Sequence, residues 1–327
     1  MREIHRVLFI RTDRMGDVLM NLPAVRLLRQ TYPKSWITFL ADKPVAPLLK
    51  HHPDLDEVME VDMKELEMSA AARGRLVCEV RKIKFDLALA SNSHKFFHWM
   101  MFAAQIPIRV GWRRKWGLLL SRSLPDEKSV KINHEVDSNL RLAGLVSSLK
   151  WDGKWNFSAG SEQAEKMEAR ISKEIPHKKQ IIAIHPGTSN PAKRWDAVNF
   201  AKLCASLERE GNYAPVLIGG SEEEPVSREV VRLSGEVITD WTGALNLNEL
   251  TAFLGSPRVR TLVSSDSGPV HIAWIQKKPV VVFYAKDVPG SDPRRWGARS
   301  AGSVIFYNSI REITTEEVQD ALKRVLS

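Results

Sequence analysis

The chain has 327 residues, of which 43% are hydrophobic and 27% charged, a composition typical of a soluble globular protein with about two domains. Cys78 and Cys204 allow at most one disulfide and no zinc spacing, so we expect a reducing, cytoplasmic setting. The first residues do not form a signal peptide, and no apolar run approaches the ~18 residues of a spanning helix. The net charge of +9 lies mainly in residues 1–160, with 26 Lys and Arg against 18 Asp and Glu.

This basic first half indicates an anionic partner, such as a phosphorylated substrate, an acidic membrane face or nucleic acid, or else a solvated basic surface. Nucleic acid is disfavoured, because the basic residues form no long run and aromatic residues do not alternate with them in a stacking pattern. We therefore expect no nucleic-acid partner.

Short apolar runs followed by Gly, Pro, Ser or Asp alternate with helical stretches in two series. This pattern predicts an α/β fold with two doubly wound parallel sheets, in domains 1–160 and 161–327. The expected strands are 7–10, 37–41, 86–90, 181–184, 216–218, 260–263 and 280–283, and the expected helices include 18–31, 161–174 and about 315–327.

Ligands of open parallel sheets bind beyond the carboxyl ends of the strands, so the turns that follow strands are informative. The first such turn crowds Arg11, Asp13, Arg14, Gly16 and Asp17 together. Gly16 permits a tight turn. Asp17 is either a helix cap or a carboxylate that accepts a proton from a substrate hydroxyl, and Arg11 with Asp13 would otherwise form a surface ion pair.

The second turn follows His185 with Pro-Gly, Thr188 and Ser189, and Lys193 comes shortly afterwards. Two hydroxyls, loop amides and an ammonium group form a phosphate cradle, although a Pro-Gly turn with solvated basic side chains has the same pattern. His185 by itself is typical of a hydrogen-bonded structural histidine.

The third turn places Gly219 and Gly220 before three acidic residues. Glu222 is a candidate acceptor for ribose hydroxyl groups. Glu223 and Glu224 are interpreted as acids that complement a helix dipole, which is also the alternative for Glu222.

The fourth turn is the strongest signal. Asp266, Ser267 and Gly268 precede Pro269, a favoured first residue of a helix, so free amide groups would form an anion site. His271 lies in the first turn of that helix. Serine capping and a packed histidine are the alternative interpretation.

Motifs for other nucleotide chemistries are missing from the sequence. It has no G-x-G-x-x-G, no G-x-x-x-x-G-K-[ST] and no G-x-S-x-G. His51 and His52 lack metal-ligand spacing with any acid. We expect neither a cofactor nor a metal.

In order and approximate spacing, the stretches "RTDRMGDVLMNLP", "HPGTSNPAKRW", "GGSEE" and "DSGPVHIAWIQKKP" resemble glycosyltransferase family 9, the ADP-heptose lipopolysaccharide heptosyltransferases. The resemblance covers nearly the whole chain. It implies the GT-B fold, two Rossmann-like domains facing across a cleft, with the acceptor on the first and the nucleotide-sugar on the second. It also implies that the C-terminal helix crosses back to the first domain, and an inverting, metal-independent transfer of heptose.

By the same resemblance, Asp17 is the catalytic base. Because arginines stand beside it in the sequence, we expect its pKa to be lowered. Gly16 leaves room for the acceptor, and Arg11 and Arg14 bind its phosphates or position Asp17. The donor-side residues are Lys193 for phosphate, Thr188 and Ser189 beside it, Glu222 for ribose, and Asp266, Ser267, Gly268 and His271.

The chain departs from the family pattern at Asp196, at Lys277-Lys278 and at 283–286, positions that we expect to border the nucleotide. These departures leave the identity of the donor open. The alternatives are a GT-B transferase or epimerase that uses another nucleotide-sugar, and a non-catalytic protein that binds a sugar nucleotide.

The expected acceptor is a phosphorylated, lipid-linked oligosaccharide. The segment 96–120 mixes aromatic and apolar residues with Arg113, Arg114 and Lys115. It is interpreted either as a peripheral contact with the inner membrane face or as a core helix followed by a strand and a basic loop.

Overall fold

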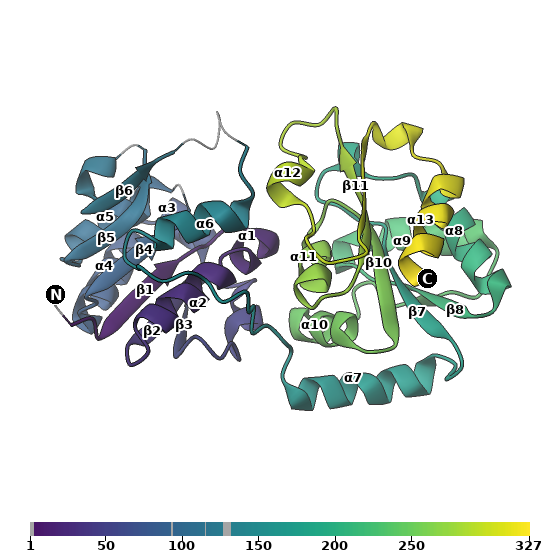
Figure 1. Ribbon diagram of the computed structural model, residues 1–327, viewed down its shortest axis with the longest axis horizontal. Coiled ribbons are helices and arrows are strands. Elements are labelled where there is room, and N and C mark those ends of the chain that lie inside the picture. Colours follow the sequence, from purple (N-terminus) through teal and green to yellow (C-terminus); the bar gives the residue numbers. More distant parts are fainter. Residues whose placement is uncertain (1–2, 93, 115, 127–131) are drawn as a thin grey trace. The chain divides into compact units, whose positions relative to one another are not determined.

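The computed structural model describes residues 3–92, 94–114, 116–126 and 132–327 (Figure 1). Contacts divide the chain into two compact units, Met1–Asn156 and Phe157–Ser327, and each has its own six-stranded sheet. None of the helices in these ranges is both long and apolar enough to span a bilayer. Lys115, which the sequence placed in a basic loop, lies outside the described residues.

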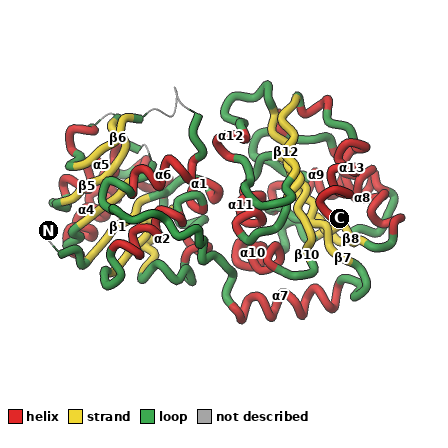
Figure 2. Tube along the Cα trace, in the orientation of Figure 1, coloured by secondary structure: helices red, strands yellow, loops and turns green. Residues whose placement is uncertain are grey.

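The first unit contains a wholly parallel sheet with the strand order β3-β2-β1-β4-β5-β6. Figure 2 colours its strands yellow and its helices red. Its strands are β1 (Arg6–Ile10), β2 (Trp36–Asp42), β3 (Glu57–Val61), β4 (Leu87–Ala90), β5 (Ile108–Arg113) and β6 (Arg122–Pro125). Its α-helices are α1 (Met15–Leu19), α2 (Leu22–Thr31), α3 (Met63–Met68), α4 (Ala70–Ile83), α5 (Lys95–Ala103) and α6 (Glu135–Ala143).

The apolar run of β1 is buried on both faces of this sheet. Leu8 and Ile10 belong to the core that α3, α4 and α5 cover. Because successive side chains of a strand alternate between faces, Val7 and Phe9 lie on the other face, that of the paired helices α2 and α6. From β1 the chain adds strands toward one edge, then returns to β4 and adds strands toward the other, so the topological switch point lies between β1 and β4.

The prediction of a single helix over residues 18–31 is wrong, because the structure has two helices there, α1 and α2. The break lies at Met20 and Asn21. The Asn21 side chain donates a hydrogen bond of 2.7 Å to the carbonyl oxygen of Asp17, and Pro23 stands in the first turn of α2. The break therefore ends α1, the short helix that carries Asp17, and the Asn21 side chain hydrogen-bonds to its last turn.

The second unit repeats this plan with the parallel strand order β12-β11-β10-β7-β8-β9. Its strands are β7 (Gln180–His185), β8 (Tyr213–Leu217), β9 (Thr239–Asp240), β10 (Val259–Ser265), β11 (Val280–Ala285) and β12 (Val304–Asn308). Its α-helices are α7 (Ser161–Glu174), α8 (Ala197–Glu210), α9 (Glu224–Ser234), α10 (Leu247–Gly255), α11 (Gly268–Ile275), α12 (Pro293–Trp296) and α13 (Thr315–Leu326).

The core of the second unit shows where the C-terminal helix packs. Val318, Ala321 and Leu322 of α13 join residues of α8 and of β7, β10 and β11 in one buried cluster. The apolar face of α13 is thus occupied within the second unit. In this sheet the switch point lies between β7 and β10, the two strands that end in His185 and Ser265.

Candidate active site

Arg11 is the first residue after β1 and lies at the switch point of the first sheet. Its side chain reaches the turn after β4, where Nη1 donates a hydrogen bond of 3.0 Å to the carbonyl oxygen of Ser91. Arg11 is only 4% exposed. The interpretation of Arg11 and Asp13 as a solvated surface ion pair is therefore wrong for Arg11.

Three carboxylates surround this buried guanidinium group. Arg11 Nη2 donates a hydrogen bond to Asp17 Oδ1 at 2.5 Å, and Nε lies 2.8 Å from Asp13 Oδ2. Nη1 lies 3.4 Å from Oε1 of Glu135, which is fully buried in the first turn of α6. The sequence analysis missed Glu135, because no local pattern links it to a turn 124 residues earlier. One guanidinium group is thus shared among three acidic side chains.

The Asp17 side chain is 21% exposed. Burial raises the pKa of the Asp17 carboxyl group, and the charges of Asp13 and Glu135 raise it further. Arg11 lowers that pKa by its charge and hydrogen bond but does not outweigh them. The predicted lowered pKa of Asp17 is therefore wrong.

Asp17 is also not the cap of its helix. The N-cap of α1 is Arg14, an exposed residue, and Asp17 stands third in the helix. Gly16 is buried inside α1, and its carbonyl oxygen accepts the N–H of Met20 at 3.0 Å. The carboxylate of Asp17 is thus directed to Arg11 instead of to the helix amides.

In the second unit, His185 connects the turns that follow β7, β8 and β10. Its Nδ1 lies 3.0 Å from Ser264 Oγ and 3.1 Å from Ser267 Oγ, and its Nε2 lies 2.9 Å from Glu223 Oε2. His185 is buried, in agreement with its interpretation as a hydrogen-bonded structural histidine. It spans the switch point of the second sheet.

Glu223 is a structural carboxylate that the sequence analysis assigned only to a helix dipole. Its Oε2 accepts the N–H of Gly220 at 2.9 Å, and a Cβ on Gly187 would lie 1.9 Å from its Oε1. Burial raises the pKa of Glu223, but the hydrogen bond and charge of His185 and the Gly220 amide outweigh burial, so the net pKa is lowered. Glu222, the predicted ribose-binding acid, is exposed beside it.

Lys193 and Asp266, predicted on separate turns, form an ion pair. Lys193 Nζ donates to Asp266 Oδ2 at 2.8 Å, and the Ser291 hydroxyl donates to the same oxygen at 3.3 Å. The two charged side chains are 17% and 12% exposed. The ammonium group is thus held beside the end of β10.

The helix predicted after Asp266 is α11, with Ser267 as its N-cap and Gly268 and Pro269 as its first residues. The Ser267 hydroxyl contacts His185 and Ser264 and does not cap the helix. The backbone N–H groups of the first turn are therefore served by no side-chain cap.

The remaining candidates on this unit differ in exposure. His271 is buried within α11, and its Nδ1 accepts the indole N–H of Trp274 at 3.2 Å. Thr188 is buried and its hydroxyl accepts the N–H of Asn190 at 3.4 Å, whereas Ser189 is exposed. Of these three, Ser189 is the most accessible to a ligand.

At two positions that depart from the family pattern, Lys278 and Tyr284, the side chain hydrogen-bonds to backbone carbonyl oxygens of the same unit. Lys278 Nζ donates to the carbonyl oxygens of Ser256 and Val259 at 2.7 and 2.9 Å, and the Tyr284 hydroxyl donates to that of Trp296 at 3.0 Å. Lys277 has a left-handed backbone with φ of 65°. These residues hold local structure.

A sequence model described as glycosyltransferase family 9 (heptosyltransferase) matches residues 73–326. The chain belongs to glycosyltransferase family 9. Lipopolysaccharide heptosyltransferase 2 of Salmonella typhimurium is 26% identical over 95% of this chain and 92% of its own length. The protein is thus a glycosyltransferase of the heptosyltransferase type, as predicted.

Solved structures of the family share its fold. A family 9 glycosyltransferase from Veillonella parvula has a TM-score of 0.88 at 21% identity, covering 99% of this chain and 98% of its own. ADP-heptose lipopolysaccharide heptosyltransferase II of E. coli has a TM-score of 0.80 at 21% identity, covering 98% of both chains. The predicted GT-B class, with two Rossmann-like units, is confirmed.

Proposed function

We propose that this family 9 enzyme transfers heptose from ADP-heptose, or a related nucleotide-sugar, to a phosphorylated lipid-linked oligosaccharide with inversion at the anomeric carbon. The names of its relatives support both substrate classes, since they include lipopolysaccharide heptosyltransferases and an ADP-heptose enzyme. The excess basic charge of the first unit suits a phosphorylated acceptor. The first unit binds the acceptor and the second binds the donor.

The proposal rests chiefly on the geometry of Asp17. Its carboxylate is positioned by a buried guanidinium group, is partly accessible and has a raised pKa. A raised pKa makes a carboxylate a stronger base. Asp17 accepts the proton of the acceptor hydroxyl as that oxygen attacks the anomeric carbon opposite the departing nucleotide, and Arg11 positions it.

The second unit stabilises the leaving nucleoside diphosphate. Lys193 supplies a fixed positive charge, and the N-terminus of α11 at Ser267 and Gly268 supplies amide groups and the positive end of a helix dipole. The hydroxyl groups of Ser189 and Thr188 donate hydrogen bonds to phosphate beside Lys193, and the carboxylate of Glu222 accepts hydrogen bonds from the ribose hydroxyl groups. Asp266 and His271 keep the lysine and the helix in place. In this proposal, Lys193 and the N-terminus of α11 neutralise the negative charge of the leaving nucleoside diphosphate.

Incubation of the purified enzyme with a panel of ADP-, UDP- and GDP-sugars and a phosphorylated lipid-linked acceptor tests the proposal. Mass spectrometry identifies the product, and NMR gives its anomeric configuration. We expect transfer from ADP-heptose with inversion. Retention of configuration would contradict the role of Asp17 as base, and turnover with UDP- or GDP-sugars alone would contradict the donor.

A further inference from the structure

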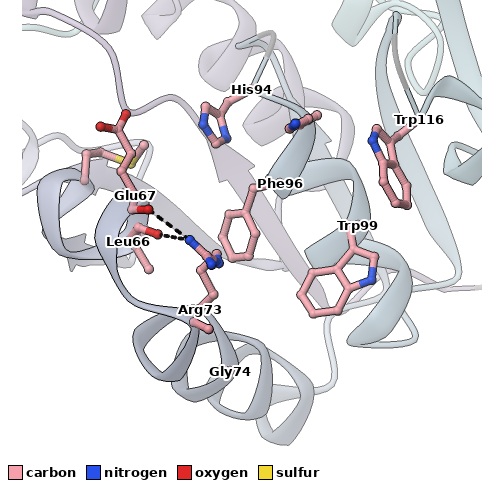
Figure 3. Close-up of a pocket in the computed structure, with 11 residues that line it drawn as sticks. Leu66, Glu67, Arg73, Gly74, His94, Phe96, Trp99 and Trp116 are labelled. Atoms are coloured by element: carbon pink, nitrogen blue, oxygen red, sulfur yellow. Dashed lines mark hydrogen bonds between the residues drawn. The ribbon is translucent and has the colours of Figure 1, made fainter.

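The first unit contains an apolar pocket of about 610 Å³ that the proposed chemistry does not use (Figure 3). It lies among α3, α4 and α5, beside residue 116. Met63 follows β3, His94 lies between β4 and α5, and Trp116 follows β5. Because the carboxyl ends of parallel strands meet at one edge of a sheet, the pocket lies on the same edge as the turn of Asp17. Its volume is in the ~300–1,000 Å³ range of ligand pockets.

Aromatic rings form much of its wall. Phe96 is buried, and its ring centroid lies 6.4 Å from that of His94 and 6.0 Å from that of Trp99. Trp99 and Trp116 are 39% and 52% exposed. Figure 3 shows Phe96 between Arg73 and Trp99, with Trp116 beyond Trp99 on the side away from Arg73. Large apolar surfaces open to water, in a concave site, mark places where an apolar ligand binds.

Gly74 lines the pocket from the middle of α4. A Cβ at this position would have no atom of the chain within 4 Å, so packing does not require glycine. Glycine in a helix interior is destabilising relative to alanine. Gly74 weakens its helix and leaves open space in the pocket. Close approach of a ligand to the backbone at this position would explain the glycine.

Of the charged side chains that line the pocket, Arg73 and Lys95 are basic and Glu67 is acidic. Lys95 is exposed at its rim, and the guanidinium group of Arg73 donates to the carbonyl oxygens of Leu66 and Glu67 at 2.7 and 3.1 Å. Arg113, at the end of β5, is exposed as well. Apolar side chains continue from the same helices and turn onto the surface, namely Met68, Phe102 and Leu118, which are 89%, 51% and 101% exposed.

We propose that this pocket binds one acyl chain of the anionic lipid-linked acceptor, an inference that rests on the proposed function. The apolar walls take the chain, the tryptophans lie at the boundary between apolar and wet surroundings, and the basic rim meets phosphate. A sugar ring is a poorer fit, because the walls are mainly apolar. The acceptor is thus held at two points along one sheet edge.

A binding experiment on the full chain isolates the pocket from catalysis. The probe is monododecyl phosphate below its micellar concentration, measured by calorimetry and by tryptophan fluorescence. We expect saturable binding that weakens up to about fourfold for each methylene group removed from the chain. Binding that is independent of chain length would overturn the proposal.

Two tryptophan substitutions on α4 provide a matched pair. Gly74→Trp fills the pocket and should weaken monododecyl phosphate binding at least tenfold, whereas Ala71→Trp adds the same side chain at an exposed position outside the pocket. ADP affinity should stay as in the unaltered enzyme for both variants. A cooperative thermal transition shows that each variant is folded, and Gly74→Trp should be no less stable, because it removes a glycine from a helix interior. Equal probe binding by the two variants would place the chain elsewhere and contradict the proposal.

Transfer to an acylated acceptor and to its deacylated form then connects the pocket with turnover. We expect a lower KM for the acylated form, and Gly74→Trp should remove this difference while leaving kcat on the deacylated acceptor unchanged. If the enzyme turns over both forms with equal KM, the acyl-chain proposal fails and the proposed function stands. If neither acceptor reacts with any donor of the panel, the proposed function itself fails.

Discussion

Arg11 Nη2 and Asp17 Oδ1 lie 2.5 Å apart at the switch point of the first sheet, and burial of this pair gives the carboxylate its direction and its basicity. The guanidinium group is shared with Asp13 and Glu135, so it does not neutralise Asp17 fully. An exposed aspartate would be a weaker base and would lack a fixed direction. The relationship therefore identifies which carboxylate of the crowded turn is suited to proton transfer.

Asp17→Asn should reduce kcat by at least ~100-fold, the scale expected for loss of a general base, because the amide cannot accept the proton. ADP affinity and the unfolding temperature should change little. Asp13→Asn is the matched control, since Asp13 contacts the same guanidinium group but is 46% exposed. Steady-state transfer assays decide the matter, and near-normal turnover by Asp17→Asn would remove it as the base.

Glu135→Gln should change the pH dependence of kcat/KM. If Asp17 is the base, as we propose, transfer requires its ionised form, and activity falls as the pH drops through the pKa of Asp17. The charge of Glu135 raises that pKa. Its removal should move the acid limb of the profile to lower pH, measured on one acceptor for both enzymes. A shift to higher pH, or none, would contradict this coupling.

Lys193→Ala should weaken ADP binding and kcat together, because the proposed role of the ammonium group is to interact with the nucleotide before and during its departure. Asp266→Asn tests the pairing at 2.8 Å, since it leaves the lysine charged but removes its carboxylate partner. We expect a smaller loss in that variant, visible by calorimetry with ADP and in transfer assays. Unchanged ADP affinity and rate in Lys193→Ala would exclude the lysine from the donor site.

Substitution by glutamine should affect stability differently at the neighbouring residues Glu222 and Glu223. Glu223→Gln loses charge-assisted bonding to His185 and should reduce the free energy of unfolding by about 1–3 kcal/mol at neutral pH. Because the folded pKa of Glu223 is lowered from 4.5, its stabilisation is present above that value and is lost as pH falls through the folded pKa. The two proteins should therefore converge in stability in acid.

Glu222→Gln is the control for that experiment and also a test of the donor site. Glu222 is exposed, so its amidation should leave the unfolding temperature unchanged while raising the KM for the nucleotide-sugar. If Glu223→Gln instead raised the donor KM and left stability intact, the assignments of the two acids would be exchanged.

The sequence predicted the central strands well because each is an apolar run buried on both faces, as in β1 and β7. It missed the edge strands β3, β6, β9 and β12, of which β3 has glutamates among its apolar residues and β9 has only two residues. Glu135 could not be predicted, because its partner Arg11 is distant in sequence. Nothing local distinguishes Glu222 from Glu223, since only the fold brings Gly187 and His185 against the second of them.

The left-handed backbone of Lys277 gives a last prediction, on stability. A residue with a Cβ is strained at a φ of 65° by roughly 1–2 kcal/mol, whereas glycine is not. Greater freedom of glycine in the unfolded chain offsets about 0.4–1 kcal/mol of that gain. Lys277→Gly should therefore stabilise the protein by about 0.5–1 kcal/mol without altering donor KM, and Lys277→Ala, which keeps the strain, should not. Chemical denaturation measures both variants, and an altered donor KM in Lys277→Ala would mean that the lysine side chain reaches the nucleotide-sugar.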